Sequence, residues 1–138
     1  MVTVVHADYR SGNYLHDADG RITAMLDWEM AHLGDPHEDL GWAAMPYWSS
    51  GGRVCGLLPL EDFLGRWEER TGLRADPARV RFYQVLGTAK MMAIALTGTR
   101  NLCNGRTNEP TLAIVGLLNG RLARELLELI DVREEATR

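Results

Sequence analysis

The chain has 138 residues, of which 46% are hydrophobic, and its formal net charge is −4 at pH 7. This length fits one domain with its own core, and the acidic balance argues against nucleic acid or an anionic membrane as a partner, because both bind basic surfaces. No apolar run reaches the roughly 18 residues of a membrane span and the N-terminus lacks a targeting pattern, so we expect a cytoplasmic protein whose Cys55 and Cys103 are free thiols.

The first part of the chain has the pattern of short strands. Residues 2–5 (VTVV) are β-branched and apolar, which predicts a buried strand that leads into a loop at His6. Residues 14–16 and 21–26 flank the turn sequence DADG and predict a β-hairpin. A small set of strands is therefore expected before the chain turns helical.

Helical signals dominate from residue 35 onward. Asp35, Pro36 and Glu38 are an N-cap, a first-turn proline and a capping-box acid, so a helix is expected from here to about Pro46. Apolar spacing and end signals predict three more helices: one through residues 60–67 that stops at Gly72, one from Asp76 to about Gly98, and one from about Thr111 after a loop at 101–110.

Polar side chains gather at the open end of the predicted hairpin. If pairing partners have numbers that sum to about 40, Asn13 falls opposite Asp27. Asp8 precedes Asn13 on the loop that enters the hairpin, so the three side chains are expected to converge. Amide and carboxylate oxygens are ligands suited to Mg²⁺, and a nearby second carboxylate is able to accept a hydroxyl proton or to orient the hydroxyl.

The order of these residues resembles a known family. HADYRSGN at residues 6–13 matches the H-x-D-x-x-x-x-N catalytic loop of the aminoglycoside phosphotransferase and choline kinase group, relatives of the protein kinases. LDWE at 26–29 resembles the metal-binding segment of that group, and GDPHEDLGW at 34–42 resembles its G-D-P-x-x-D-L continuation. The helical remainder is similar to the kinase-like domains found beside some acyl-CoA dehydrogenases.

The resemblance implies a fold and a reaction. The fold is a mainly helical α+β domain, the C-terminal lobe of the protein-kinase-like phosphotransferase fold, with a catalytic loop and hairpin at 1–34 and a helical body at 35–138. The reaction is Mg²⁺-dependent transfer of the γ-phosphoryl group of ATP or GTP to a hydroxyl of a small substrate. The acceptor stays open between an aminoglycoside, a hydroxyacyl thioester and another alcohol.

The resemblance also implies roles for single residues. Asp8 would be the catalytic base or the carboxylate that orients the hydroxyl, Arg10 would contact the transferred phosphoryl group, and His6 would hold the loop. Asn13 and Asp27 would bind Mg²⁺ on the nucleotide phosphates. Glu29 would support the metal, and Asp39 would brace the catalytic loop from below.

Each residue also has a purely structural interpretation. Asp8 and Asn13 are residue types that commonly bond their own loop backbone, Arg10 is as consistent with a surface ion pair as with a phosphate ligand, and Asp35 is explained by capping alone. Core packing explains the four tryptophans better than an aromatic substrate cage does; they are Trp28, Trp42, Trp48 and Trp67.

Two departures from the family pattern bear on activity. Ala7 stands where the family has Gly, so the loop is strained if that backbone needs a positive φ. Only five residues precede His6 and the single lysine is Lys90, so we expect the N-terminal nucleotide lobe to be absent.

Two functions follow from these observations. In the first, the chain is the C-terminal lobe of a phosphotransferase that works with a lobe from elsewhere. In the second, it is a truncated, non-catalytic binding or self-assembling module with a vestigial site, in which a homodimer covers exposed apolar surface. A metal-dependent hydrolase is a weaker alternative, because further His or carboxylate ligands are lacking.

Overall fold

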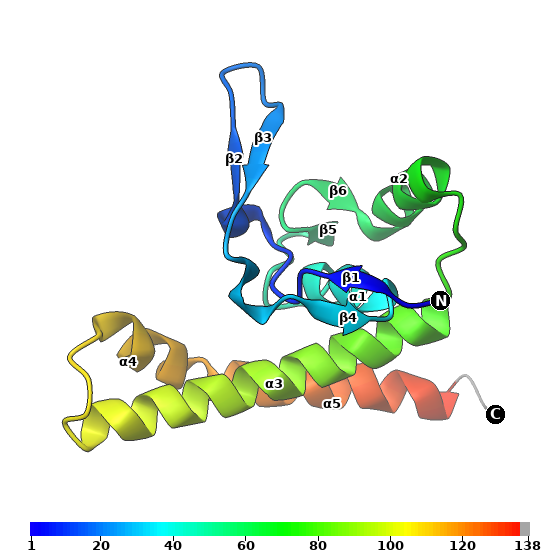
Figure 1. Cartoon of the computed structure of the whole chain (residues 1–138). Coiled ribbons are helices and arrows are strands. Elements are labelled where there is room, and N and C mark those ends of the chain that lie inside the picture. The colour runs from blue at the N-terminus through cyan, green and yellow to red at the C-terminus, as the bar shows by residue number, and fades with distance from the viewer. Residues whose placement is uncertain (136–138) are drawn as a thin grey trace. The chain divides into compact units, whose positions relative to one another are not determined.

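The computed structural model describes residues 1–135, which form two compact units (Figure 1). The first unit is Met1–Gln84 and the second begins at Val85. All strands of the described residues lie in the first unit, together with helices α1 and α2. The expectation of a single domain over residues 1–138 stays a prediction.

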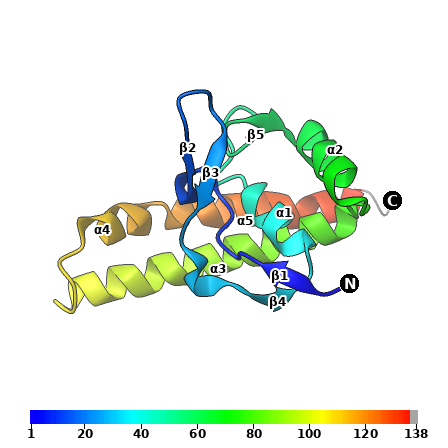
Figure 2. The ribbon, with the colours of Figure 1, turned by 45° about the horizontal axis from the view of Figure 1, so that its top comes forward.

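The strands of the first unit form three antiparallel pairs. β1 (Thr3–Val5) pairs with β4 (His32–Gly34), β2 (Tyr14–His16) with β3 (Ile22–Met25), and β5 (Arg53–Val54) with β6 (Leu58–Pro59). The strand at residues 2–5 is present as β1, but the prediction that it is buried was wrong, since Val2 and Val4 are 72% and 61% exposed. The hairpin is confirmed, whereas the sequence analysis did not predict β4, β5 or β6. Figures 1 and 2 show β1 and β4 beside α1. The loop of residues 6–13 follows directly after β1.

The predicted hairpin register was wrong by one residue. Tyr14 pairs with Met25 and Leu15 with Ala24, and an irregularity follows between Leu15 and His16. The turn centre lies one residue earlier than predicted: His16 pairs with Ile22 on the turn side, and the irregularity changes the sum of partner numbers from 38 to 39 toward the open end. Leu26 therefore lies opposite Asn13, and its N–H donates to the Asn13 carbonyl at 2.7 Å. Asp27 follows one residue beyond that pair.

Helix α1 (His37–Ala43) begins as the capping pattern predicted. The Asp35 carboxylate accepts a hydrogen bond from the His37 N–H at 3.0 Å and lies 2.6 Å from His37 Nδ1, while Arg79 Nη1 donates to its second oxygen at 3.1 Å. Partial burial alone would raise the pKa of Asp35, but the bonds from His37 and the charge of Arg79 leave that pKa below its usual value. Asp35 thus anchors the start of α1.

The core of the first unit surrounds the end of α1. Ala43, Ala44 and Val54 are buried together, and Phe63 packs on them from α2 (Leu60–Thr71). Helix α2 ends as predicted at Gly72, whose φ of 70° is one that glycine adopts readily.

The second unit consists of helices. Helix α3 (Pro77–Cys103) enters it from the first unit and extends past the predicted end at Gly98, and α5 (Asn119–Glu135) runs back along it (Figure 2). The single last helix predicted from about Thr111 is instead two, since α4 (Pro110–Leu117) ends before α5 begins. The Asn119 amide donates to the Gly116 carbonyl at 3.0 Å, and this local bond competes with a continuous helix.

Among residues 1–135, no helix is long and apolar enough to cross a bilayer.

Replacing Gly41 by Ala should destabilise the first unit by about 2 kcal/mol or more. A Cβ on Gly41 would lie 2.8 Å from the Val80 carbonyl oxygen and 2.9 Å from the Gln84 backbone nitrogen, and backbone atoms cannot move aside cheaply. Gly65→Ala is the matched control, because nothing lies within 4 Å of its added Cβ and alanine favours helix. Thermal unfolding of both variants measures the difference, and equal melting temperatures would show that α1 and α3 do not pack this closely.

Candidate active site

The loop from His6 to Asn13 is held by the first turns of α1. Asp39 accepts the His6 N–H on Oδ2 at 2.9 Å and the Ala7 N–H on Oδ1 at 2.8 Å. His6 and Ala7 are each only 3% exposed, so these bonds satisfy two buried donors. Burial raises the pKa of Asp39, although the two N–H bonds oppose that rise. The contact is the brace that the sequence suggested for Asp39.

The backbone bends sharply at Ala7. Its φ of 67° lies in the left-handed region, which costs a residue with a Cβ about 1 kcal/mol relative to the right-handed region. The strain anticipated for an alanine at this position is therefore present. The bonds to Asp39 hold the bend, which directs Asp8 away from β1.

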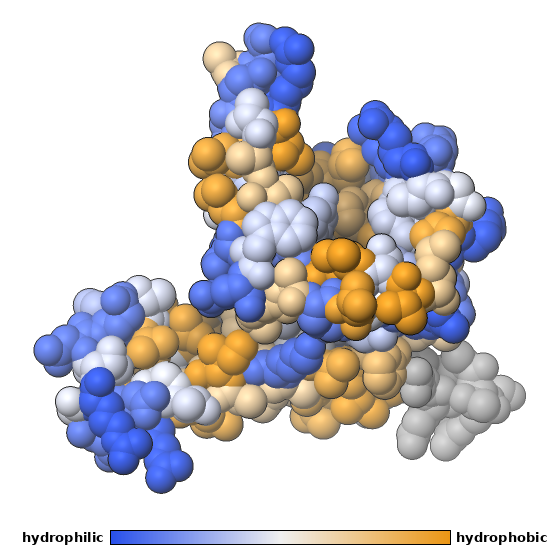
Figure 3. All heavy atoms as spheres, in the orientation of Figure 1, coloured by the Kyte–Doolittle hydropathy of each residue, from blue (hydrophilic) through white to orange (hydrophobic). Residues whose placement is uncertain are grey.

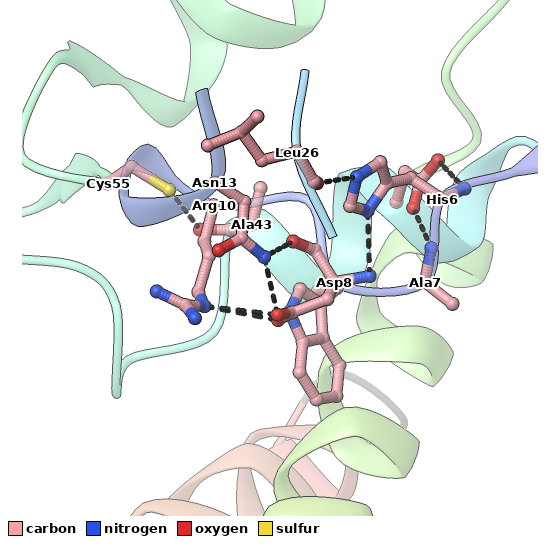
Figure 4. A network of polar contacts seen from close by, with 10 residues as sticks. His6, Ala7, Asp8, Arg10, Asn13, Leu26, Ala43 and Cys55 are labelled. Carbon is pink, nitrogen blue, oxygen red and sulfur yellow. Dashed lines mark hydrogen bonds and ion pairs between the residues drawn. The ribbon is translucent and has the colours of Figure 1, made fainter. Parts of the chain in front are cut away.

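His6 joins the loop to the end of the hairpin. Its Nε2 lies 2.8 Å from the Leu26 carbonyl oxygen, and its Nδ1 lies 3.2 Å from the Asp8 backbone nitrogen (Figure 4). A carbonyl requires a donor and an N–H requires an acceptor, so this geometry suits a proton on Nε2 and an acceptor at Nδ1. The ring also lies 4.6 Å from that of Trp28. Both ring nitrogens are thus engaged within the protein, which fits the holding role.

The Asp8 carboxylate is the centre of the polar network in Figure 4. Oδ1 accepts the indole N–H of Trp42 at 3.0 Å, and Oδ2 accepts Asn13 Nδ2 at 2.5 Å. Arg10 Nε lies 3.2 and 3.3 Å from the two oxygens. The Asp8 side chain is 15% exposed, so a nearly buried charge is balanced by one cation and two neutral donors.

Arg10 lies between this carboxylate and an aromatic ring. Its guanidinium carbon is 5.1 Å from the centroid of the Trp48 ring, within the range of a cation–π contact. The Arg10 side chain remains 30% exposed. In this position it neutralises Asp8 and leaves one edge of the guanidinium near solvent.

Asn13 is oriented by its bonds to Asp8. It is 4% exposed, and its Nδ2 donates to both the backbone carbonyl and the carboxylate of Asp8. Because the amide is planar, Oδ1 points away from Asp8. Asp27 is exposed and has a φ of 65°, one residue after the Leu26 N–H that bonds Asn13. Asp27 thus follows directly after the backbone pair that joins Asn13 to Leu26.

These oxygens suit a hard cation that keeps much of its water. Residues 1–135 contain no cluster of three or more His, Cys, Asp or Glu side chains able to hold a metal. Asn13 and Asp27 carry two oxygen groups of the kinds that Mg²⁺ accepts, and this ion commonly takes only one or two ligands from protein when phosphates and water provide the others. Glu29, also exposed, lies in the one-turn helix Trp28–Met30 that follows Asp27.

Trp42 and Trp48 were both expected in the core. Trp42 is buried as expected, and the structure also places both rings against charged residues of the loop. The spacing of residues along α1 could have predicted that Trp42 faces the loop. Residues three apart share a helix face, and Trp42 follows Asp39 by three positions. Asp39 had already been assigned to the loop side of the helix.

Cys55 is a half-buried thiol that packs close to the loop. Its half-buried Sγ–H points at the Ala43 carbonyl at 3.6 Å, and burial raises the thiol pKa although Ser11 and Arg10 oppose the rise. A thiol with a raised pKa stays protonated and unreactive near neutral pH.

The sequence matches one family and several curated relatives. The model of the phosphotransferase enzyme family matches residues 1–83. Acyl-CoA dehydrogenase family member 11 of Gallus gallus is 34% identical over 106 residues, 67% of this chain and 14% of that protein. Acyl-CoA dehydrogenase family member 10 of Mus musculus is 38% identical over 47 residues, 33% of this chain and 4% of that protein. The chain therefore spans a small part of each relative.

A solved structure has the same fold. The crystal structure of a Ralstonia eutropha protein proposed to be an aminoglycoside phosphotransferase superposes with a TM-score of 0.74, at 23% identity. The superposition covers 93% of this chain and 42% of that one. The likeness therefore extends over both the catalytic loop and the helices, and it concerns the fold.

Proposed function

Because the chain belongs to the phosphotransferase enzyme family, we propose that its Asp8 site transfers the γ-phosphoryl group of ATP or GTP to a hydroxyl of a small molecule, in the presence of Mg²⁺. The observation that carries this proposal is the placement of Asp8. Its carboxylate is fixed by Asn13 and Trp42 beside the hairpin edge that carries Asn13 and Asp27.

Asp8 is proposed as the group that meets the acceptor hydroxyl. It accepts the hydroxyl proton as the hydroxyl oxygen forms a bond to the γ-phosphorus, while the bond from phosphorus to the bridging oxygen breaks and the nucleoside diphosphate leaves with the electron pair. Both Asp8 oxygens contact Arg10, so Arg10 has to turn aside before the hydroxyl is accepted. A guanidinium that turns toward the phosphoryl group would stabilise its developing charge.

Asn13 and Asp27 are proposed to hold Mg²⁺, and Glu29 to support it through water. The ion, when bound, neutralises phosphate charge and aligns the phosphates. His6 and Asp39 have a structural role. Their bonds to the loop backbone and to Leu26 fix where Asp8 and the hairpin end lie.

The chain covers 42% of the solved structure that it resembles. We infer that a nucleotide-binding lobe strengthens the binding of phosphate at this site. The acceptor is proposed to be an alcohol, such as an aminoglycoside or a hydroxyacyl thioester.

The second candidate is an assembly module, favoured by one surface. Val4 and Leu33 are cross-strand partners on β1 and β4, yet they are 61% and 73% exposed. Figure 3 shows hydrophobic side chains gathered over these strands. Exposed apolar pairs of this kind are typical of interfaces. A second copy of the chain or a separate lobe would cover the surface.

Calorimetric titration with Mg·ATP and Mg·GTP tests the function, and the oligomeric state is recorded in the same buffer. We expect micromolar binding that requires Mg²⁺ and is lost in Asp27→Ala, because the variant removes a charged metal ligand from an exposed position. Asp19→Ala, at the exposed turn of the same hairpin, is the matched control and should bind as the unchanged chain does.

Binding that survives Asp27→Ala would remove the proposed metal role. A folded dimer that binds no nucleotide would favour the assembly module instead.

A further inference from the structure

One contact of the catalytic loop is not explained by the family pattern, and it links residues far apart in the sequence. Trp42, on α1 and only 4% exposed, donates its indole N–H to Asp8 Oδ1 at 3.0 Å across 34 positions of sequence. A buried indole N–H needs an acceptor. Here the acceptor is the carboxylate to which the reaction is assigned.

The four contacts of Asp8 divide into two kinds. Asn13 and Trp42 are neutral donors, one on each oxygen, and both are buried. Arg10 spans both oxygens at longer distances and is partly exposed. Two rigid donors, one on each oxygen, fix the plane of the Asp8 carboxylate. The long and flexible Arg10 side chain, in contrast, is able to move away from it. When Arg10 leaves, Asn13 and Trp42 alone determine where the vacated lone pairs point.

We propose that Trp42 is a positioning residue, whose indole N–H holds the Asp8 carboxylate in the orientation that receives the acceptor hydroxyl. This inference rests on the proposed function of Asp8. Asp39 and Trp42 lie one turn apart on α1. The helix that holds the loop backbone through Asp39 therefore also orients the Asp8 carboxylate through Trp42. Backbone and carboxylate are placed by one rigid element.

Two substitutions separate the hydrogen bond from simple packing. Trp42→Phe keeps a large ring and removes the donor. Trp42→His leaves a larger void but retains a ring N–H at about the position of the indole nitrogen at pH 8, where imidazole is neutral. If the hydrogen bond matters, His outperforms Phe; if only packing matters, Phe outperforms His, because it fills more of the space.

The measurement is Mg·ATP hydrolysis by the 138-residue chain, with water as the probe acceptor. We expect kcat to fall about 10- to 100-fold in Trp42→Phe, as for a small misplacement of a reacting group, and less in Trp42→His, with the KM for ATP unchanged in both. Equal rates in all three proteins, or a higher rate in Phe than in His, would overturn the proposal.

An NMR measurement keeps this test independent of turnover. In the unchanged chain the Trp42 indole N–H should exchange slowly with solvent, and Asp8→Val should make it exchange fast. If the unchanged chain hydrolyses no ATP, the proposed function of the isolated chain fails, while a slow, Asp8-dependent exchange still supports the hydrogen bond that positions the carboxylate. Fast exchange in the unchanged chain overturns the positioning role whatever the activity.

Discussion

Replacing Asp8 by Asn should lower the rate of phosphoryl transfer about 10²- to 10⁴-fold, which is the usual contribution of a general base. The amide has nearly the shape of the carboxylate but cannot take up the hydroxyl proton. It also carries no charge to hold Arg10, whose Nε lies 3.2 Å from Oδ1. The affinity for Mg·nucleotide should stay the same, because Asn13 and Asp27 are the proposed metal ligands. Rates at saturating nucleotide, together with calorimetry, separate the two effects.

The control for Asp8→Asn is Asp62→Asn, which makes the same chemical change at an exposed position in the first turn of α2. This control should change neither rate nor affinity. If Asp8→Asn also leaves both untouched, Asp8 is a loop residue that bonds its own backbone. If it removes nucleotide binding instead, Asp8 belongs to the metal site rather than to the acceptor side.

Features set by neighbouring residues were predictable from the sequence. The strand before His6, the capped start of α1 at Asp35 and the stop of α2 at Gly72 all depend on local backbone preferences, and all three are present. The predicted fold class, a mainly helical α+β domain of the kinase-like phosphotransferase fold, is confirmed by the similar solved structure.

Features set by distant partners were not predictable in this way. β4 is three residues long and exists because it pairs with β1, about thirty residues earlier in the chain. The hairpin register depends on an irregularity between Leu15 and His16 that no residue type in the sequence predicts. Trp42 is buried as predicted, but its contact with Asp8 and that of Trp48 with Arg10 depend on the placement of the loop, which the sequence alone does not give.

Asp39→Ala should have the largest effect on stability, about 2 to 4 kcal/mol, because it leaves the buried N–H groups of His6 and Ala7 without acceptors. Burial raises the pKa of Asp39, which means that the ionised carboxylate is itself costly in the fold. Removing that charge recovers part of the stability that is lost with the two hydrogen bonds. Urea unfolding at pH 7 measures the difference, and Asp62→Ala should change it by less than about 0.5 kcal/mol.

The same substitution tests how the loop is organised. Asp39→Ala removes the two bonds that hold the backbone on either side of the strained Ala7, whose φ is 67°, so the bend should relax and move Asp8 away from Trp42 and Asn13. We therefore expect phosphoryl transfer to be lost in Asp39→Ala even at temperatures where the variant remains folded by circular dichroism. A folded variant with full activity would show that the loop keeps its conformation without the carboxylate, and that α1 contributes packing rather than a brace.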